Sequence, residues 1–447
     1  MERADGAPGL SSKPAPHQWT EAPGDVLLDE LFSYVSHGIE WGLGRMESFL
    51  GATGDPHLGI PCVHIGGTNG KGSVASTVAS VLNGAGHRVG LYTSPHLCFL
   101  RERYQVGGVQ VDDEELRELA GELDAEIRRH RLTFFEAATA LAFHLFKRRQ
   151  VEISVIEVGL GGRLDATNVV TPFLTAITNV DLDHCDYLGS TLDEIAKEKA
   201  GIIKAGVPLI TTESDERIRS LIATQCDAVG APFIRVESDV ESMGVELKED
   251  FTAFDVLTTR WGRLHLRTPL LGEHQAVNAT LAVTLLEHMP PPFRPDPTTL
   301  VEGVSRVDWP GSVQVERLEG RTWVFDVAHN TAGAVALSAV LGRMELPRPL
   351  VLLTAVLGDK DWREMLPPLF ETADHAILTQ APTAPLDRRW EPREAVTESG
   401  SGVAEIQTDF VRALDRAREL AGSGTVVVTG SAHTVGDALR GLGLQGS

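Results

Sequence analysis

The stretch 64-HIGGTNGKGSVAS-76 decides how the rest of this sequence is interpreted. Four glycines and one lysine lie within the seven positions from Gly66 to Gly72. The β-branched segment 60-IPCVHI precedes them, and apolar residues at helical spacing begin near Ser73. Glycines let backbone N–H groups approach phosphate oxygens, and a helix N-terminus adds a favourable dipole. A strand, a glycine-rich turn and a helix in this order therefore predict a phosphate-binding loop.

The loop departs from the usual pattern G-x-x-x-x-G-K-[ST] at two positions. Ile65 stands where the first glycine is expected, and Gly72 displaces the hydroxyl, which arrives one residue later as Ser73. Lys71 is still placed to reach the β- and γ-phosphates, and Thr68 or Ser73 can offer a hydroxyl to phosphate or metal. An ordinary glycine-rich turn between a strand and a helix remains the alternative.

Short β-branched runs alternate with longer helical patterns in two parts of the chain, which predicts mostly parallel sheets covered by helices. In the first part, the expected strands are 60–65, 88–93, 151–158, 173–180 and 206–212. Helices are expected there over ranges that include 73–86 and 133–149. In the second part, the expected strands are 323–328, 350–357, 374–380, 402–406 and 425–430. The fold class is therefore α/β in both parts.

We expect three segments along the chain. Residues 1–24 are rich in Pro, Gly and Ser and are predicted to be a disordered tail, with a helix beginning near Asp25. Residues 25–295 are expected to form a domain with the phosphate loop and a doubly wound, mostly parallel sheet. Residues 296–447 are expected to form a smaller, Rossmann-like α/β domain. The division is placed by 289-MPPPFRPDP, which interrupts regular structure, and a cleft is expected between the domains.

Composition excludes several classes of protein. The chain has 447 residues, 42% of them hydrophobic and 23% charged, as in globular proteins. Its net charge of −22 would repel nucleic acid, so no nucleic-acid partner is expected. No apolar run reaches the roughly 18 residues that suggest a membrane span, and the N-terminal residues lack the basic-then-apolar layout of a secretory signal, so no membrane partner is expected. The four cysteines are scattered without metal spacing, which favours a reducing cytoplasm.

A second glycine-rich stretch, 155-VIEVGLGGRLDATNVV, follows an apolar strand. The strand ends in Glu157, and the loop after it contains Asp165. Ligands of open α/β sheets bind beyond the carboxyl ends of the strands, so Glu157 is expected at the same crevice as the phosphate loop. A carboxylate there is a suitable Mg²⁺ ligand, because magnesium prefers hard oxygens. The alternative is that Glu157 caps the following turn.

A third stretch, 178-TNVDLDHCDYLGSTLDEIAKEKAGIIK, begins at another strand end with the cluster Asp181, Asp183 and His184. This cluster suggests a metal or phosphate contact, although a single histidine is more often structural. A helix is expected to follow, with Thr191 as its cap and Glu194 at the capping-box position. Spacing alone leaves Lys199, near its end, as a solvated charge.

Three smaller clusters leave their role open. Ser94 and His96 end a strand and are followed by Arg101 and Arg103, which face either an anionic substrate or solvent. Phe134 and Phe135 of 133-TFFEAATALAF are compatible with simple core packing. In 325-FDVAHNTAG, the cluster of Asp326, His329 and Asn330 ends a strand of the second domain and is expected to face the cleft.

With these stretches in place, the chain resembles the folylpolyglutamate synthase and dihydrofolate synthase family, the folate branch of the Mur ligase superfamily. The resemblance covers roughly residues 27 to 440, and the displaced serine is a mark of this branch. The matching motifs occur in the family order: GTNGKGS, YTSPHL, TFFE, EVGLGGRLDATNVV, the DH pair, IAKEKAGIIK, LGEHQAVNA, WPG, FDVAHN and DKD.

The resemblance implies an ATP-dependent amide ligase. The γ-phosphoryl group of ATP passes to a carboxylate of dihydropteroate or a reduced folate such as tetrahydrofolate, and the amine of L-glutamate attacks the acyl phosphate. ADP and phosphate leave. Such a reaction needs positioning and charge neutralisation more than a covalent protein group, and the sequence shows no Ser or Cys triad. A monomer is implied as well.

The family pattern also implies roles for individual residues. The resemblance implies that the ATP phosphates are bound by Gly67, Thr68, Asn69, Gly70, Lys71, Gly72 and Ser73. It implies other nucleotide contacts for Gln275, Asn278 and Asp326. Thr133, Phe135, Glu136 and Asp165 match positions that line the pocket for the pterin of the acceptor. His329 and, more weakly, Ser431 match positions that contact glutamate.

Two Mg²⁺ ions are implied. Ser94 and Glu157 match the ligands of one ion, and His184 matches a ligand of the second. Lys199 matches a lysine that is carbamylated in similar enzymes, which reverses its interpretation as a solvated charge. Lys71, Glu157, His184 and Lys199 are thus the expected catalytic groups.

Two departures from the family pattern concern the nucleotide side. Ser312 of 309-WPGS replaces an arginine that contacts ATP phosphates, and Val327 replaces the glycine of the usual DGAHN. Arg306 or Arg317 is a candidate to replace the missing charge, which can be worth orders of magnitude in rate. Three alternatives stay open: a related ligase for another carboxylate, a P-loop kinase or NTPase without amide formation, and an ATP-binding relative without turnover.

Overall fold

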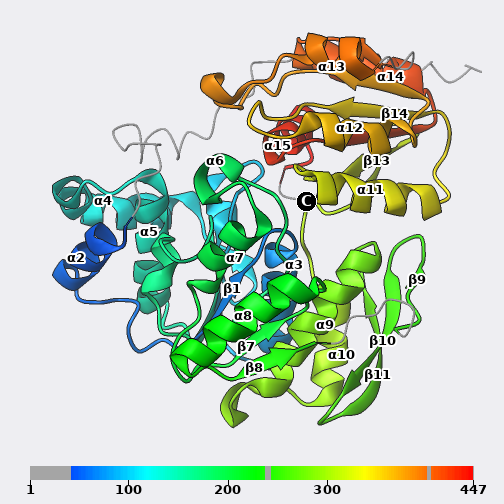
Figure 1. Cartoon of the computed structure of the whole chain (residues 1–447). Coiled ribbons are helices and arrows are strands. Elements are labelled where there is room, and N and C mark those ends of the chain that lie inside the picture. Colours follow the sequence, from blue (N-terminus) through cyan, green and yellow to red (C-terminus); the bar gives the residue numbers. More distant parts are fainter. Residues whose placement is uncertain (1–41, 237–242, 400–403, 446–447) are drawn as a thin grey trace, which may run out of the picture.

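The computed structural model describes residues 42–236, 243–399 and 404–445. The predicted tail at 1–24 and the predicted helix beginning near Asp25 lie outside the described residues. Two α/β parts lie one above the other in Figure 1, the first coloured blue to green and the second yellow to red. The expected α/β fold class is confirmed in both parts.

The first part is built on an eight-stranded sheet. Its strands lie in the order β4 (Val109–Gln110), β3 (Tyr104–Val106), β2 (Val89–Tyr92), β5 (Ile153–Glu157), β1 (Cys62–Gly66), β6 (Leu174–Ile177), β7 (Leu209–Thr211) and β8 (Phe233–Arg235). From β2 to β8 all neighbours are parallel, and only β3 and β4 are added antiparallel. The central strands β1, β2, β5, β6 and β7 are buried at every residue, which explains their continuous β-branched runs.

Helices cover both faces of this sheet. One face packs against α3 (Lys71–Gly84), α9 (Glu273–His288) and α10 (Pro297–Ser305). The other face packs against α2 (Gly44–Ala52), α4 (Asp113–His130), α5 (Phe134–Arg148), α7 (Leu192–Ala200) and α8 (Glu216–Val229). A short helix, α6 (Cys185–Leu188), precedes α7. The predicted capping box of α7 is confirmed, since Thr191 and Glu194 bond reciprocally.

A three-stranded antiparallel sheet was not expected from the sequence. Its strands lie in the order β11 (Gly262–Thr268), β10 (Thr252–Thr258) and β9 (Glu246–Leu247). β10 and β11 pair along their full length, and Phe254 and Leu266 join the core cluster of α9 and α10. This sheet therefore supports the helices that cover one face of the large sheet.

The second part contains a six-stranded sheet in the order β12 (Gln314–Leu318), β13 (Arg321–Phe325), β17 (Thr425–Thr429), β14 (Leu350–Thr354), β15 (His375–Leu378) and β16 (Ala404–Ile406). Only β12 is antiparallel. One face carries α11 (Thr331–Arg343), α12 (Trp362–Phe370) and α13 (Pro392–Ser399), and the other carries α14 (Phe410–Ala421) and α15 (Ala432–Gly441).

The place where the first domain ends stays a prediction. Helix α10 begins at Pro297, inside the expected second domain, yet it packs against α3 and β11 of the first part. These contacts favour a division after Ser305 rather than at 295. No helix in the described part of the chain is long and apolar enough to cross a membrane.

A loop of the first domain contributes to the core of the second. Cys98 is buried in the same cluster as Phe325, Val428 and Leu439, and Leu97 and Phe99 pack against that cluster. The Glu102 carboxylate accepts hydrogen bonds from the backbone N–H groups of residues 97–99 and fixes this loop. The two domains are therefore anchored to each other at this point.

Gly436 of α15 lies at this anchor, where a Cβ would come within 2.0 Å of the Leu97 carbonyl oxygen. We predict that Gly436→Ala destabilises the protein by about 1–3 kcal/mol, because the backbone contact leaves no room for a methyl group. Urea unfolding measures the effect.

Gly342→Ala in α11 is the matched control, because nothing lies within 4 Å of a Cβ built there. This control should be neutral or stabilising by up to about 1 kcal/mol. Equal stability of the two variants would contradict the tight contact at Gly436.

Candidate active site

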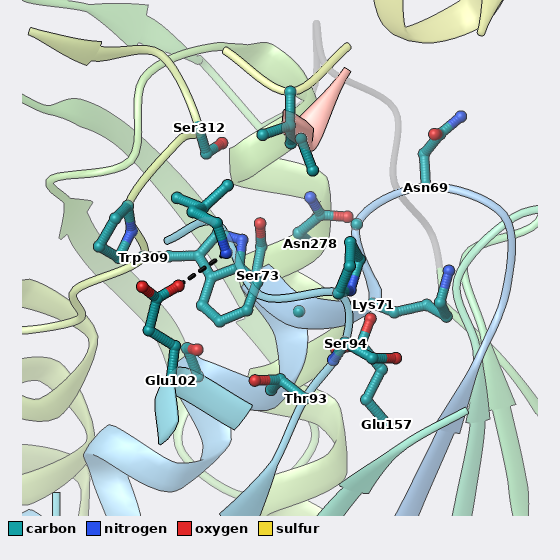
Figure 2. Close-up of a pocket in the computed structure, with 18 of the residues that line it drawn as sticks. Asn69, Lys71, Ser73, Thr93, Ser94, Glu102, Glu157, Asn278, Trp309 and Ser312 are labelled. Carbon is teal, nitrogen blue, oxygen red and sulfur yellow. Dashed lines mark hydrogen bonds between the residues drawn. The ribbon is translucent and has the colours of Figure 1, made fainter. Parts of the chain in front are cut away.

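A cavity of about 860 Å³ opens between the two domains, at the carboxyl ends of the parallel strands of the first sheet. Most predicted site residues line it: Gly67 to Ser73, Ser94, Glu157, His184, Lys199, Gln275, Asn278, Asp326 and His329. Figure 2 shows Lys71, Ser94 and Glu157 close together, with Trp309 and Ser312 approaching from the other side. Segments of both domains thus meet around one space.

The phosphate loop is tied to the segment that follows β6. Thr178 donates from Oγ1 to the Asn69 carbonyl at 2.7 Å, and Asn69 N–H donates to the Asn179 side chain at 2.9 Å. Lys71 Nζ bonds the carbonyl of Thr68, within its own loop, at 2.8 Å. These hydrogen bonds within the protein fix the shape of the loop, and its lysine lies at the N-terminus of α3.

Glu157 is a buried carboxylate at the end of β5. Its Oε2 accepts a hydrogen bond from the Ser94 backbone N–H at 3.0 Å. Burial raises the pKa of Glu157 to about 7, although the nearby charge of Lys71 and the Ser94 bond act in the opposite direction. A cation bound beside it would hold this carboxyl group in its ionised form.

Lys199 is 4% exposed at the end of α7, so it is not the solvated charge that spacing alone suggested. Its Nζ donates to the Gly67 carbonyl at 2.8 Å and so reaches the start of the phosphate loop. Burial, with the charge of Lys71, lowers the pKa of Lys199 to about 7. A large share of this amine is therefore neutral near neutral pH.

Asp183 connects the two domains beside the cavity. Its carboxylate accepts from Lys360 Nζ at 2.5 Å and lies 3.2 Å from His329 Nε2 and 3.4 Å from Asn330 Nδ2. All three partners come from the second domain, and Asp183 is 9% exposed. Burial would raise the pKa of Asp183, but the His329 hydrogen bond and the charges of His329 and Lys360 hold it well below its usual range.

The same lysine approaches a predicted metal ligand. Lys360 Nζ lies 3.4 Å from His184 Nε2. Burial lowers the pKa of His184 to about 3, so its imidazole is neutral at neutral pH. In this conformation, an ammonium group therefore occupies the side of His184 that a cation would use.

The side chains that border the cavity offer only a partial set of ligands for Mg²⁺. Within residues 42–236, 243–399 and 404–445, no group of three or more His, Cys, Asp or Glu side chains is arranged to hold a metal ion. Ser94 and Glu157 offer hard oxygens on one wall of the cavity, beside the loop that receives phosphate. Magnesium usually keeps water and substrate phosphate in its shell, so one carboxylate and one hydroxyl fit a nucleotide-borne Mg²⁺.

The residues that were predicted to contact the nucleotide also meet at the cavity. Gln275 Nε2 donates to Ser312 Oγ at 2.6 Å, and its Oε1 accepts from Asn278 at 3.1 Å. Arg306 lines the cavity, whereas Arg317 lies outside its lining and pairs with Glu249 on the surface.

Five predicted residues do not line the cavity: Thr133, Phe135, Glu136, Asp165 and Ser431. Thr133 and Glu136 form the capping box of α5, with Arg45 paired to Glu136. Phe135 lies against Gly159, which does line the cavity. Ser431 caps α15 and bonds Ala355. Their substrate roles stay predictions.

Three residues near the cavity were not assigned from the sequence. Lys360 belongs to the DKD motif, Glu102 fixes the loop after Ser94, and Trp309 belongs to the WPG motif. The motifs signalled Lys360 and Trp309, but only the docking of the domains shows which groups they meet.

We predict that Lys360→Met lowers the free energy of unfolding by about 3 kcal/mol, because it leaves the buried Asp183 carboxylate without its cation. Urea unfolding measures this loss. The double variant Asp183→Asn/Lys360→Met should recover part of it.

Arg317→Met is the control, since that residue and Glu249 form a pair whose side chains are 72% and 81% exposed. Its cost should stay below about 1 kcal/mol. If both variants lost a similar free energy of unfolding, the contact between Lys360 and Asp183 would stabilise the protein no more than an exposed ion pair does.

Comparison with known proteins agrees with this geometry. The Mur ligase middle domain matches residues 65–286, and the Mur ligase glutamate ligase domain matches residues 312–433. The dihydrofolate synthase/folylpolyglutamate synthase of Bacillus subtilis is 31% identical over 91% of this chain and 96% of its own length. A probable bifunctional folylpolyglutamate synthase/dihydropteroate synthase of Haloferax volcanii is 35% identical, and the match covers 91% of this chain but only 49% of that protein.

A solved structure shares the whole architecture. The Escherichia coli FolC protein in complex with DHPP and ADP is 29% identical, with a TM-score of 0.79 over 94% of this chain and 97% of that chain. Together with the match to the B. subtilis protein, this likeness settles the family. The chain belongs to the folylpolyglutamate synthase/dihydrofolate synthase family of Mur ligases, which are ATP-dependent glutamate ligases.

Proposed function

We propose that this chain joins L-glutamate to the carboxylate of dihydropteroate, of a reduced folate, or of both, through an acyl phosphate. One observation carries the proposal: a phosphate loop and a buried strand-end carboxylate share one cavity with a polar cluster of a second α/β domain. A simple P-loop kinase or NTPase has no need of that second cluster. The relatives that cover nearly the whole chain carry the names of these ligases.

The bonds of the reaction change in two steps. A carboxylate oxygen of the acceptor attacks the γ-phosphorus of ATP, and ADP leaves with the electrons of the broken P–O bond. The glutamate nitrogen then attacks the acyl carbon, loses a proton, and phosphate leaves with the former carboxylate oxygen. Phosphoryl transfer of this kind depends on positioning and on charge neutralisation.

The residues of the chain divide this work between the domains. Lys71 and the backbone of its loop bind the transferring phosphate. Asp326, 8% exposed, accepts hydrogen bonds from the backbone N–H groups of Val313 and Ala328 and is proposed to contact the nucleotide. His329, held by Asp183, is proposed to contact the glutamate. Closing the second domain over the loop excludes water, which would otherwise hydrolyse the acyl phosphate.

We assign the first Mg²⁺ to Ser94 and Glu157 and a second to the neighbourhood of His184. Bound there, the ions would neutralise phosphate charge. We also propose carbamylation of Lys199, because a buried and largely neutral amine is the form that adds CO₂. A second ion at His184 requires Lys360 to move from its place in this conformation.

The acceptor is proposed to bind beside Phe135, Thr133, Glu136 and Asp165, next to the Gly159 wall of the cavity. The glutamate side is proposed to include Ser431, through the start of α15. A monomer in the cytoplasm is proposed as well, and the four unpaired cysteines support a reducing compartment.

The direct test measures phosphate release with ATP and Mg²⁺, using dihydropteroate or tetrahydrofolate, each with and without L-glutamate. We predict release that requires both an acceptor and glutamate, and one amide product per phosphate. Release that does not depend on glutamate would favour an NTPase or kinase.

The variant Lys199→Ala should remove activity and leave the circular dichroism spectrum unchanged. Full activity in that variant would exclude Lys199 from the site.

We further propose that Arg306 supplies the positive charge that Ser312 lacks. Arg306→Ala should reduce kcat/KM for ATP by about tenfold or more, as expected for a group that stabilises transferring charge. Arg317→Ala is the control, because that residue lies outside the cavity lining and pairs with Glu249. Steady-state kinetics with varied ATP decides between them, and equal rates for both variants would contradict the role of Arg306.

A further inference from the structure

His64 lies in the middle of β1 and is completely buried. Its side chain points to the face of the sheet opposite α3, because Val63 and Ile65 on either side of it join the core of α3. An imidazole inside a core costs free energy unless it is hydrogen-bonded. His64 has one such partner: its Nε2 lies 2.8 Å from Thr167 Oγ1.

The next contacts fix the direction of this hydrogen bond. Thr167 Oγ1 donates its single proton to Asp165 Oδ1 at 2.5 Å. A hydroxyl that donates in one direction can only accept in the other, so His64 must carry its proton on Nε2. His64 Nδ1, which has no partner among the described residues, is then a bare lone pair. Burial lowers the pKa of His64 to about 3, which keeps this neutral tautomer at neutral pH.

The chain of hydrogen bonds ends on a loop that borders the cavity. Asp165 Oδ1 also accepts from the backbone N–H of Thr167 at 3.0 Å, and Asp165 Oδ2 accepts from the backbone N–H of Leu160 at 2.8 Å. Leu160 and its neighbours Gly159 and Gly161 line the cavity. The direction in which the Asp165 carboxylate points therefore determines where this wall of the cavity stands.

The same wall carries the ring of Phe135. A Cβ on Gly159 would be 2.2 Å from Phe135 Cζ, so the ring rests directly on the loop backbone. Beyond Asp165, the loop is tied down again by Asn168, whose Nδ2 donates to the carbonyls of Arg163 and Gly201. The hydrogen bonds from His64 thus hold the part of the loop between the sheet and the Phe135 ring.

We propose that His64 is a positioning residue for the acceptor: through Thr167 it orients Asp165 and with it the Gly159–Gly161 wall. This inference rests on the proposed function, because it takes the acceptor to bind at that wall. The His64 side chain bonds Thr167 and does not line the cavity, so its effect is expected to fall on the acceptor and not on ATP. A histidine that only fills the core would show no such preference.

The test compares His64→Leu, which removes the donor, with His64→Gln, whose side-chain amide nitrogen can replace Nε2. The KM for dihydropteroate should rise about tenfold in His64→Leu, the size expected when an orienting partner is removed. The KM for ATP should change less than about twofold, and His64→Gln should return most of the acceptor affinity. Steady-state kinetics with each substrate varied in turn gives both constants.

Thr167→Val breaks the chain one step later, and Thr167→Ser keeps it. We expect Thr167→Val to match His64→Leu, Thr167→Ser to match the wild type, and the double variant His64→Leu/Thr167→Val to be no worse than either single variant. Calorimetric titration with ADP and then with dihydropteroate gives a second readout that needs no turnover. Thermal melting curves identify any variant that fails to fold.

Three results would overturn the inference: equal loss of affinity for ATP and acceptor, no change in His64→Leu, or no recovery in His64→Gln. These results are distinguishable from failure of the proposed function. A wild type that binds ADP but forms no amide with either acceptor would overturn the proposed function and the inference together. A wild type that forms the amide while His64→Leu keeps its acceptor KM would overturn the inference alone.

Discussion

The buried carboxylate of Asp183 joins the two domains beside the cavity, in addition to the apolar anchor at residues 97–99. It follows β6 of the first domain, and its partners Lys360, His329 and Asn330 all belong to the second. A buried carboxylate without such partners would carry an uncompensated charge, so its ionised form requires the docked second domain. The same side chains reach the cavity, because His329 lines it and Asn330 exchanges two hydrogen bonds with Asn69 of the phosphate loop. Docking of the domains and assembly of the site are therefore one event.

The first domain gathers positive charge where phosphate is expected. Lys71 and Lys199 both donate to carbonyls of the phosphate loop. Burial and the charge of Lys71 lower the pKa of Lys199. Glu157 is the acidic group beside these lysines, and burial raises its pKa to about 7. In this conformation, both lysine side chains bond the loop itself. A triphosphate with its cation would satisfy both lysines and the carboxylate at once.

The sequence predicted the parts of this arrangement that local patterns encode. The central parallel strands could be predicted because they are buried on both faces and form continuous β-branched runs, and Thr191 and Glu194 marked the start of α7. The phosphate loop and Glu157 followed from their positions at strand ends. Lys199 could be recognised only by likeness to a family, since a lysine near a helix end looks exposed until its neighbours are known.

The remaining parts depend on contacts between distant segments. Asp183 and Lys360 are 177 positions apart, and neither residue type reveals its partner. In the sheet that was not predicted, β9 has two residues and most of β11 is exposed, whereas β10 is largely buried. His64 reads as one more residue of a buried strand, and only the positions of Thr167 and Asp165 give it a role. The acceptor pocket stayed a prediction for the same reason, since Phe135 touches the cavity wall and not the cavity.

The central claim is that the acceptor carboxylate is phosphorylated before glutamate attacks it. The most direct measurement uses dihydropteroate, or tetrahydrofolate, labelled with ¹⁸O in its carboxylate, and mass spectrometry of the phosphate that is released with ATP and glutamate. An acyl phosphate transfers one carboxylate oxygen to each phosphate, so the account predicts singly ¹⁸O-labelled phosphate in step with amide formation. Phosphate that contains only unlabelled oxygen would contradict the account, because it would mean that water, and not the acceptor, takes the phosphoryl group.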